Sequence, residues 1–219
     1  MRIFLDTANM DEIEQGVRWG VLSGVTTNPS LAAKEGIGET DAYRKVVVAV
    51  CQIVDGPVSA EVLSTDASGM VEEGRNIATW HPNVVVKLPS TAAGLEAMAI
   101  LSKENIVINQ TLCFSVNQAL LGAQAGASFV SPFVGRLVDE GHDGMQLVSD
   151  IVSIFRNYNI STKVLAASIR DPLQCVEAAK CGADIVTIPF KVLSQMIQHS
   201  LTDAGVARFT NDWESAKKS

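Results

Sequence analysis

The stretch NVVVKLPST, residues 83–91, places Lys87 directly after three valines. A run of valines bounded by Pro89 is typical of a buried strand. A lysine in such a strand must be paired or must give up its charge, because an isolated buried ammonium is costly. Burial among apolar walls favours the neutral amine, and a neutral amine can attack a carbonyl carbon to form an imine. Lys87 is therefore a candidate for Schiff-base catalysis.

Two carboxylates could serve this amine. Asp6 ends the segment IFLD, and Glu61 lies in VSAEV. Either could move the protons that imine chemistry requires. Each also has a structural alternative. Glu61 could form a structural ion pair with Lys87, and an aspartate that follows a strand is most often a turn or cap residue.

Other polar residues follow predicted strands. Arginine side chains offer a fixed fork of donors that suits phosphate, and neighbouring serine hydroxyls add to it. The structural alternative for an arginine after a strand is a solvated side chain or a surface ion pair. The pattern predicts a phosphorylated carbonyl substrate. The candidate residues at these strand ends are Thr26, Asn28, Asn109, Thr111, Ser131, Arg136, Ser168 and Arg170.

Short apolar runs alternate with longer segments whose apolar residues recur every three or four positions, which indicates parallel βα units. One such segment, RDPLQCVEAAKCG, predicts a helix with Asp171 as N-cap, Gly182 as its stop, and Val176 and Ala179 on one apolar face. Eight predicted strands precede such segments. They are Ile3–Asp6, Gly24–Thr27, Val58–Leu63, Val84–Leu88, Ile106–Leu112, Ser128–Phe133, Lys163–Ser168 and Ile185–Ile188.

Eight βα units in 219 residues predict a single (β/α)8 barrel domain, residues 1–219, with a further helix at 202–216. A doubly wound open sheet is the alternative, but LDTANMDEI lacks the glycine-rich phosphate fingerprint that usually follows its first strand. In a barrel the carboxyl ends of all strands meet at one opening. The polar residues named above should therefore gather there.

Composition restricts the partners. The net charge of −7 argues against nucleic acid or an anionic membrane. The longest apolar run noted, Val46–Cys51, is far shorter than the roughly 18 residues of a membrane span. The segment MRIFLDT does not resemble a secretory signal, so we expect a cytoplasmic protein. The four cysteines form no CxxC pair and the three histidines show no metal-ligand spacing, so reduced core thiols and no metal site are expected.

In its ordered motifs the chain resembles the transaldolase family, in the short form shared with fructose-6-phosphate aldolase. The resemblance covers essentially the whole chain and implies an enzyme without a metal or organic cofactor. It also implies transfer of a dihydroxyacetone unit from sedoheptulose 7-phosphate or fructose 6-phosphate to an aldose phosphate, in the pentose phosphate pathway. The motifs are FLDTAN, GVTTNPSL, VSAEV, VVKLPST, SPFVGRL, LAASIRDP, GADIVTIPF and LTDAGVARFTNDW.

By this resemblance, Lys87 is the Schiff-base lysine and Asp6 the acid/base that takes the C4 hydroxyl proton. Glu61 and Thr111, with Asp6, would hold the catalytic water, and Thr26 would help to position this group. The resemblance also assigns substrate contacts. Asn28, Asn109 and Ser131 would bind the dihydroxyacetone hydroxyls, and Arg136, Ser168 and Arg170 would bind phosphate.

Two positions separate the sister activities. The aldolase branch typically has glutamine at the position of Glu61 and tyrosine at that of Phe133, so this chain is similar to transaldolase at both. A fructose-6-phosphate aldolase that releases free dihydroxyacetone is the alternative. A catalytically silent sugar-phosphate-binding barrel is a third hypothesis, which the amine among valines disfavours. Gln110 departs from the usual family pattern, and strand alternation predicts that it points away from the barrel centre.

The C-terminal segment LTDAGVARFTNDWES places Val206, Phe209 and Trp213 along one helical stripe. On pattern alone this helix would cover its own barrel. The family resemblance implies instead a helix that packs on a neighbouring subunit of a homo-oligomer, either a pentamer or a decamer of two pentamers.

Overall fold

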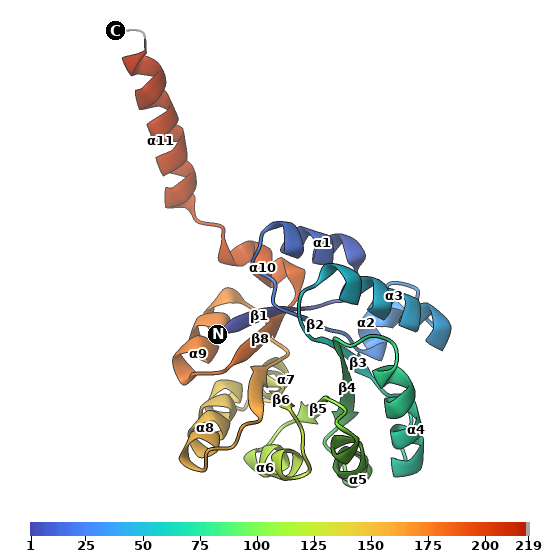
Figure 1. The fold of residues 1–219 in the computed structure, drawn as a ribbon. Helices are drawn as coiled ribbons and strands as arrows, with labels where there is room; N and C mark the ends of the chain where they lie inside the picture. Colours follow the sequence, from blue (N-terminus) through green and yellow to red (C-terminus); the bar gives the residue numbers. More distant parts are fainter. Residues whose placement is uncertain (218–219) are drawn as a thin grey trace.

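A computed structural model describes residues 1–217 of the chain, so the last two residues of the predicted 1–219 domain lie outside the described part. Eight parallel strands close into a barrel in sequence order, with β8 pairing back onto β1 (Figure 1). The predicted (β/α)8 barrel is confirmed. The open-sheet alternative is wrong, because the first and last strands are hydrogen-bonded to each other.

The strands lie within two residues of the predicted bounds at every end. The strands that form the barrel wall are short, with two to six residues each. Their bounds are β1 (Arg2–Asp6), β2 (Val25–Thr26), β3 (Val58–Glu61), β4 (Val84–Pro89), β5 (Ile108–Cys113), β6 (Phe129–Pro132), β7 (Lys163–Ala166) and β8 (Ile185–Ile188).

Helices surround the barrel (Figure 1). Most begin at a side-chain cap that satisfies a free backbone N–H. Their bounds are α1 (Met10–Arg18), α2 (Pro29–Lys34), α3 (Thr40–Ile53), α4 (Ala67–Ala78), α5 (Ala92–Leu101), η1 (Ser102–Glu104), α6 (Val116–Gln124), α7 (Val134–Asp139), α8 (Gly144–Asn157), α9 (Pro172–Cys181), α10 (Phe190–Met196) and α11 (Ser200–Ala216).

Helix α9 shows what the sequence pattern could and could not decide. Asp171 accepts a hydrogen bond from the backbone of Gln174, and Gly182 ends the helix in the left-handed region at a φ of 83°, both as predicted. The predicted apolar face is wrong. Val176 is 48% exposed, whereas Cys175 and Ala178 are buried against the barrel. Cysteine and alanine are small, so α9 can approach the strands closely there, and this contact decided which face is buried.

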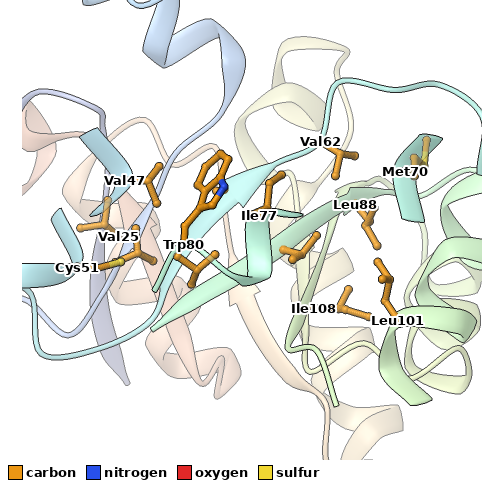
Figure 2. Close-up of a cluster of buried hydrophobic side chains, with 14 of the residues drawn as sticks. Val25, Val47, Cys51, Val62, Met70, Ile77, Trp80, Leu88, Leu101 and Ile108 are labelled. Atoms are coloured by element: carbon orange, nitrogen blue, oxygen red, sulfur yellow. The ribbon is translucent and has the colours of Figure 1, made fainter. Parts of the chain in front are cut away.

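The core is divided by the barrel wall. Phe4, Val85, Phe129, Leu165 and Ile185 form a cluster whose side chains alternate with outward-facing residues, so they fill the barrel interior. A second cluster packs outside the strands against α3, α4 and α5, and Figure 2 shows part of it. A third lies under α6, α8 and α9. The interior cluster forms an apolar floor below the carboxyl ends of the strands.

Helix α11 differs from all the others. It begins at Ser200, two residues before the predicted start, and none of its residues is buried. Figure 1 shows it extending away from the barrel beyond α10. Phe209 is 65% and Trp213 66% exposed, so the expectation that this helix covers its own barrel is wrong. Among the described residues, the rings of Phe209 and Trp213 are contacted by Arg208 and Lys217 of the same C-terminal segment.

None of the helices in residues 1–217 has both the length and the apolar character that a bilayer crossing requires. All four cysteines are free, and burial raises the pKa of Cys113 to about 12. Within the same residues, no group of three or more His, Cys, Asp or Glu side chains is placed to hold a metal ion.

Candidate active site

Lys87 lies at the carboxyl end of β4 and is only 4% exposed. Register pairs it with Glu61 on β3, so the two side chains stand at the same level on adjacent strands. Its Nζ lies 3.1 Å from Glu61 Oε2 and donates to the backbone carbonyl oxygen of Thr27 at 3.2 Å. The ion pair considered for Glu61 is therefore present. It is a buried pair, in which burial favours the neutral forms and mutual attraction favours the charged ones.

Asp6 is held by a short line of hydroxyl groups. Thr26 Oγ1 donates to Asp6 Oδ1 at 2.7 Å and lies 2.7 Å from Thr187 Oγ1. A threonine hydroxyl has a single proton. Since Thr26 gives its proton to Asp6, Thr187 must donate to Thr26. This line joins the neighbouring strands β8, β1 and β2 and fixes the orientation of the carboxylate.

Asn109 lies beside Lys87, as its register partner on β5. Ser131 on β6 donates to Asn109 Oδ1 at 2.7 Å, and Asn109 Nδ2 donates to Ser59 Oγ on β3 at 3.2 Å. All three residues are buried. The neighbouring Gln110 donates to the Gln118 carbonyl of α6 at 2.9 Å, which confirms that it points away from the barrel centre.

Thr111 is fully buried, and its hydroxyl has no hydrogen-bond partner in the described part of the chain. The backbone becomes irregular just after it. The pairing of β5 with β6 shifts register between Gln110 and Cys113, and Leu112 has a φ of 52°. Buried hydroxyls are almost always hydrogen-bonded, so an orphan at this position fits a group that binds water or a ligand.

Asn28 follows β2 and accepts a hydrogen bond from the backbone of Leu31 at 2.9 Å, as the N-cap of α2. Asn28 therefore has the capping role that asparagine often takes after a strand. The cap uses only Oδ1, which leaves the amide Nδ2 as the group that could donate to a ligand.

The predicted phosphate residues lie on the opposite side of the opening. Arg136 is exposed and its guanidinium lies 5.6 Å from the ring centre of Phe133. Arg170 donates to Asp139 Oδ2 at 2.7 Å, in a pair whose side chains are 54% and 59% exposed. The surface pair considered for an arginine after a strand is thus present as well. Both guanidinium groups lie in solvent.

Gly135 allows these two segments to approach. Its backbone N–H donates to the Ser168 carbonyl at 2.9 Å, and a Cβ on residue 135 would lie 2.1 Å from that oxygen and 2.6 Å from Arg170 Nε. Ser168 itself has a φ of 59°, a region that non-glycine residues rarely occupy. Strain of this kind commonly occurs at functional sites. α7 and the loop after β7 therefore meet in one fixed arrangement.

Several residues that the sequence reasoning missed contact the predicted set, among them Thr27, Tyr43, Ser59 and Thr187. Strand alternation could have found two of them. Ser59 lies two residues before Glu61, and Thr187 is in the middle of β8, so both face the interior. No local pattern identifies Tyr43, which comes from α3.

A cavity of about 370 Å³ lies between α2, α3 and α4, at the side of β3. Its walls are largely apolar, with Ile37, Leu63, Ile77 and Trp80 among them. Of the predicted site residues, Glu61 alone lines it. The cavity thus reaches Glu61, the partner of Lys87, from the side of these helices.

Comparison with known proteins identifies the family of this chain. Residues 3–219 match the family described as transaldolase/fructose-6-phosphate aldolase. The chain belongs to this family. A "Probable transaldolase" of Dehalococcoides mccartyi is 60% identical over 219 residues, which is all of both chains. Another, from Caldicellulosiruptor saccharolyticus, is 57% identical over all of this chain and 99% of its own length.

Among solved structures, a thiamine phosphate pyrophosphorylase from Pyrococcus furiosus superimposes with a TM-score of 0.63. The superposition covers 89% of this transaldolase-family chain and 93% of the pyrophosphorylase chain, and the two sequences are 13% identical. That likeness extends to the barrel architecture alone, since many unrelated chemistries use this fold.

Proposed function

We propose that this member of the family is a transaldolase, a transferase that moves a dihydroxyacetone unit between sugar phosphates through a Schiff base on Lys87. The observation that carries the proposal is a lysine only 4% exposed, at the carboxyl end of a barrel strand, 3.1 Å from a carboxylate. A binding protein would need neither the buried amine nor its partner. Two relatives that are 60% and 57% identical over this whole chain are named probable transaldolases, which supports the same reaction.

The Lys87–Glu61 pair can supply a neutral amine by proton transfer within the pair. Transfer of one proton from Nζ to Oε2 turns the ion pair into an amine and a carboxylic acid, and the dry surroundings reduce the cost of that neutral pair. Nζ then attacks the C2 carbonyl of a ketose phosphate. The carbonyl oxygen leaves as water, protonated by Glu61, and a protonated imine forms.

Asp6 drives the carbon–carbon cleavage. It takes the proton of the C4 hydroxyl, the C3–C4 bond breaks, and its electron pair flows to the imine nitrogen, so that an aldose phosphate leaves and an enamine stays on Lys87. The enamine C3 attacks the acceptor aldehyde, whose oxygen takes the proton back from Asp6. Water then hydrolyses the new imine. Thr26 and Thr187 keep Asp6 oriented through both proton transfers.

The remaining predicted residues act by binding. Asn28, Asn109 and Ser131 hold the hydroxyls of the dihydroxyacetone unit, and the unpartnered Thr111 hydroxyl holds the water that makes and hydrolyses the imine. Arg136, Arg170 and Ser168 bind the phosphate. For this, Arg170 exchanges its contact with Asp139 for the more highly charged phosphate.

Phe133 favours transfer over release of free dihydroxyacetone. Its ring packs edge-on against Phe114, at 5.6 Å between ring centres, and carries no hydroxyl that could protonate the enamine. An enamine that is not protonated survives until an acceptor aldehyde arrives. Fructose-6-phosphate aldolase activity is the second candidate, because the family includes both enzymes.

Two assays test the proposal. Borohydride reduction in the presence of fructose 6-phosphate should leave a stable adduct on Lys87, located by peptide mass spectrometry, and Lys87→Ala should give none. Free dihydroxyacetone is then measured with and without glyceraldehyde 3-phosphate. Transfer that depends on the acceptor, with little free dihydroxyacetone, is expected. An adduct on another residue would refute the mechanism, and steady release without acceptor would indicate the aldolase.

We further propose that the chain is a single barrel domain whose C-terminal helix, 202–216, packs on a neighbouring subunit of a cytoplasmic pentamer or decamer. Support comes from the exposed stripe of Val206, Phe209 and Trp213 on a helix that contacts little of its own barrel. Phe209→Asp with Trp213→Asp should reduce the mass measured by sedimentation equilibrium to that of the monomer. A double variant of unchanged mass would refute this packing.

A further inference from the structure

Tyr43 of α3 connects the two residues that contact Lys87 Nζ. Its hydroxyl accepts a hydrogen bond from the backbone N–H of Glu61 at 3.3 Å and is hydrogen-bonded to Thr27 Oγ1. Thr27 Oγ1 donates its only proton to the Ser59 carbonyl at 2.8 Å. Tyr43 must therefore be the donor to Thr27. The direction of every hydrogen bond from Glu61 through Tyr43 and Thr27 to Ser59 is fixed.

This arrangement replaces a bond of the regular sheet. β2 and β3 pair as far as Thr26 and Ser59, and the Thr27 N–H still donates to the Ser59 carbonyl at 3.0 Å. The next bond of a parallel ladder would run from the Glu61 N–H to the Thr27 carbonyl. Here the Glu61 N–H donates to Tyr43, and the Thr27 carbonyl accepts from Lys87 Nζ instead.

We propose that Tyr43 is a positioning residue for the imine-forming lysine: by accepting the Glu61 N–H, its hydroxyl keeps the Thr27 carbonyl free to orient Lys87 Nζ beside the Glu61 carboxylate. The inference rests on the proposed role of Lys87. Among the described residues, the Tyr43 hydroxyl is hydrogen-bonded to Thr27 and Glu61 and not to Nζ, so it acts through those two residues.

The surroundings of Tyr43 suit a fixed, neutral phenol. Burial raises the pKa of its hydroxyl, so the proton that it donates to Thr27 is retained at neutral pH. Its ring packs edge-on against Trp80, with 6.0 Å between the ring centres. Tyr43 and Trp80 also form part of the wall of the 370 Å³ cavity. The ring is thus held by packing, and the hydroxyl reaches Thr27 and the Glu61 backbone.

Tyr43→Phe separates these two roles, since it keeps the ring and removes the hydroxyl. Without it, the Glu61 N–H can take the Thr27 carbonyl as acceptor, which restores the regular ladder and removes a contact from Lys87. We expect kcat/KM to fall about tenfold and borohydride trapping to slow by a similar factor, about the effect of one hydrogen bond. The kcat/KM–pH profile should also shift, because the contact that orients Lys87 Nζ beside the Glu61 carboxylate is lost.

Tyr158→Phe is the matched control. Tyr158 is the chain's other tyrosine, is 76% exposed, and should leave all three measurements unchanged. Thr27→Val is a second test of the same hydrogen bonds, because it removes the hydroxyl that accepts the Tyr43 proton. Effects of the two changes on trapping rate should be far from additive if both act through one hydrogen-bonded unit.

A Tyr43→Phe protein with the trapping rate and pH profile of the wild type would overturn the inference. So would a variant that only loses thermal stability while its folded fraction keeps that pH profile. If Tyr43→Phe does not fold, an unchanged profile for Thr27→Val overturns the inference equally, and a shifted one supports it. Wild-type protein that forms no Lys87 adduct would refute the proposed function instead, so the two failures are distinguishable.

Discussion

The charged pairs on the two sides of the barrel opening differ in their exposure to solvent. At β3 and β4, the Lys87–Glu61 pair is 5% and 15% exposed and lies over an apolar interior. At β6 and β7, the Arg170–Asp139 pair is 54% and 59% exposed. The same kind of contact, a cation against a carboxylate at about 3 Å, is therefore dry on one side and wet on the other.

The difference follows from what each side is proposed to do. Covalent chemistry needs an amine whose proton can move, and a dry site brings the charged and neutral forms of a pair close in free energy. Phosphate binding needs permanent positive charge that a substrate can reach and leave, and arginine keeps its charge in solvent. Changes on the dry side should thus alter kcat, and changes on the wet side should alter KM.

The largest effect is expected for Lys87→Met, which keeps the length of the side chain and removes the amine. Transfer should fall by about 10⁴-fold or more, because the amine that forms the proposed imine is removed. Activity and reductive trapping are measured together. Retention of more than a small percentage of activity would contradict the assignment of the dry side.

Glu61→Gln is expected to lower kcat by about 10² to 10³-fold with little change in KM. The amide cannot take the Lys87 proton, so the neutral amine becomes harder to form. Chemical denaturation should also show a loss of a few kcal/mol, since a buried ammonium loses its partner. A normal kcat with a raised KM would reverse the proposed division of roles.

Arg170→Ala should raise KM for phosphorylated substrates by about 10 to 100-fold and leave kcat nearly unchanged. The matched control is Arg75→Ala. Arg75 forms a pair with Glu104 at 2.6 Å and is also 54% exposed, but it lies in the last turn of α4, away from the opening. Steady-state kinetics should separate the two variants, and an equal effect of both would show that general surface charge is responsible.

Asp139→Asn is the wet-side counterpart of Glu61→Gln and should have the smallest effect. Loss of an exposed pair changes the free energy of unfolding by less than about 1 kcal/mol. Release of Arg170 should leave KM the same or lower it by about twofold. Substrate titration and denaturation test this, and a loss of stability comparable with that of Glu61→Gln would remove the contrast between the sides.

The sequence by itself determined the barrel and the strand ends at which its functional groups lie. Short apolar runs identified the strands, and the alternation of side chains along a strand places Lys87, Asn109 and Thr111 inward and Gln110 outward. Local signals also placed the Asp171 cap and the Gly182 stop. These features depend on neighbours in the chain, so a single sequence contains them.

Only the tertiary structure decided which groups meet. Thr187 contacts Thr26 across 161 positions, and Tyr43 reaches Glu61 from α3, because barrel closure and helix packing bring distant segments together. Pattern alone placed the α11 stripe against its own barrel and buried the wrong face of α9, for the same reason. Hydrophobic periodicity shows that a helix has an apolar face, but the shape of the surface it meets decides which residues are covered.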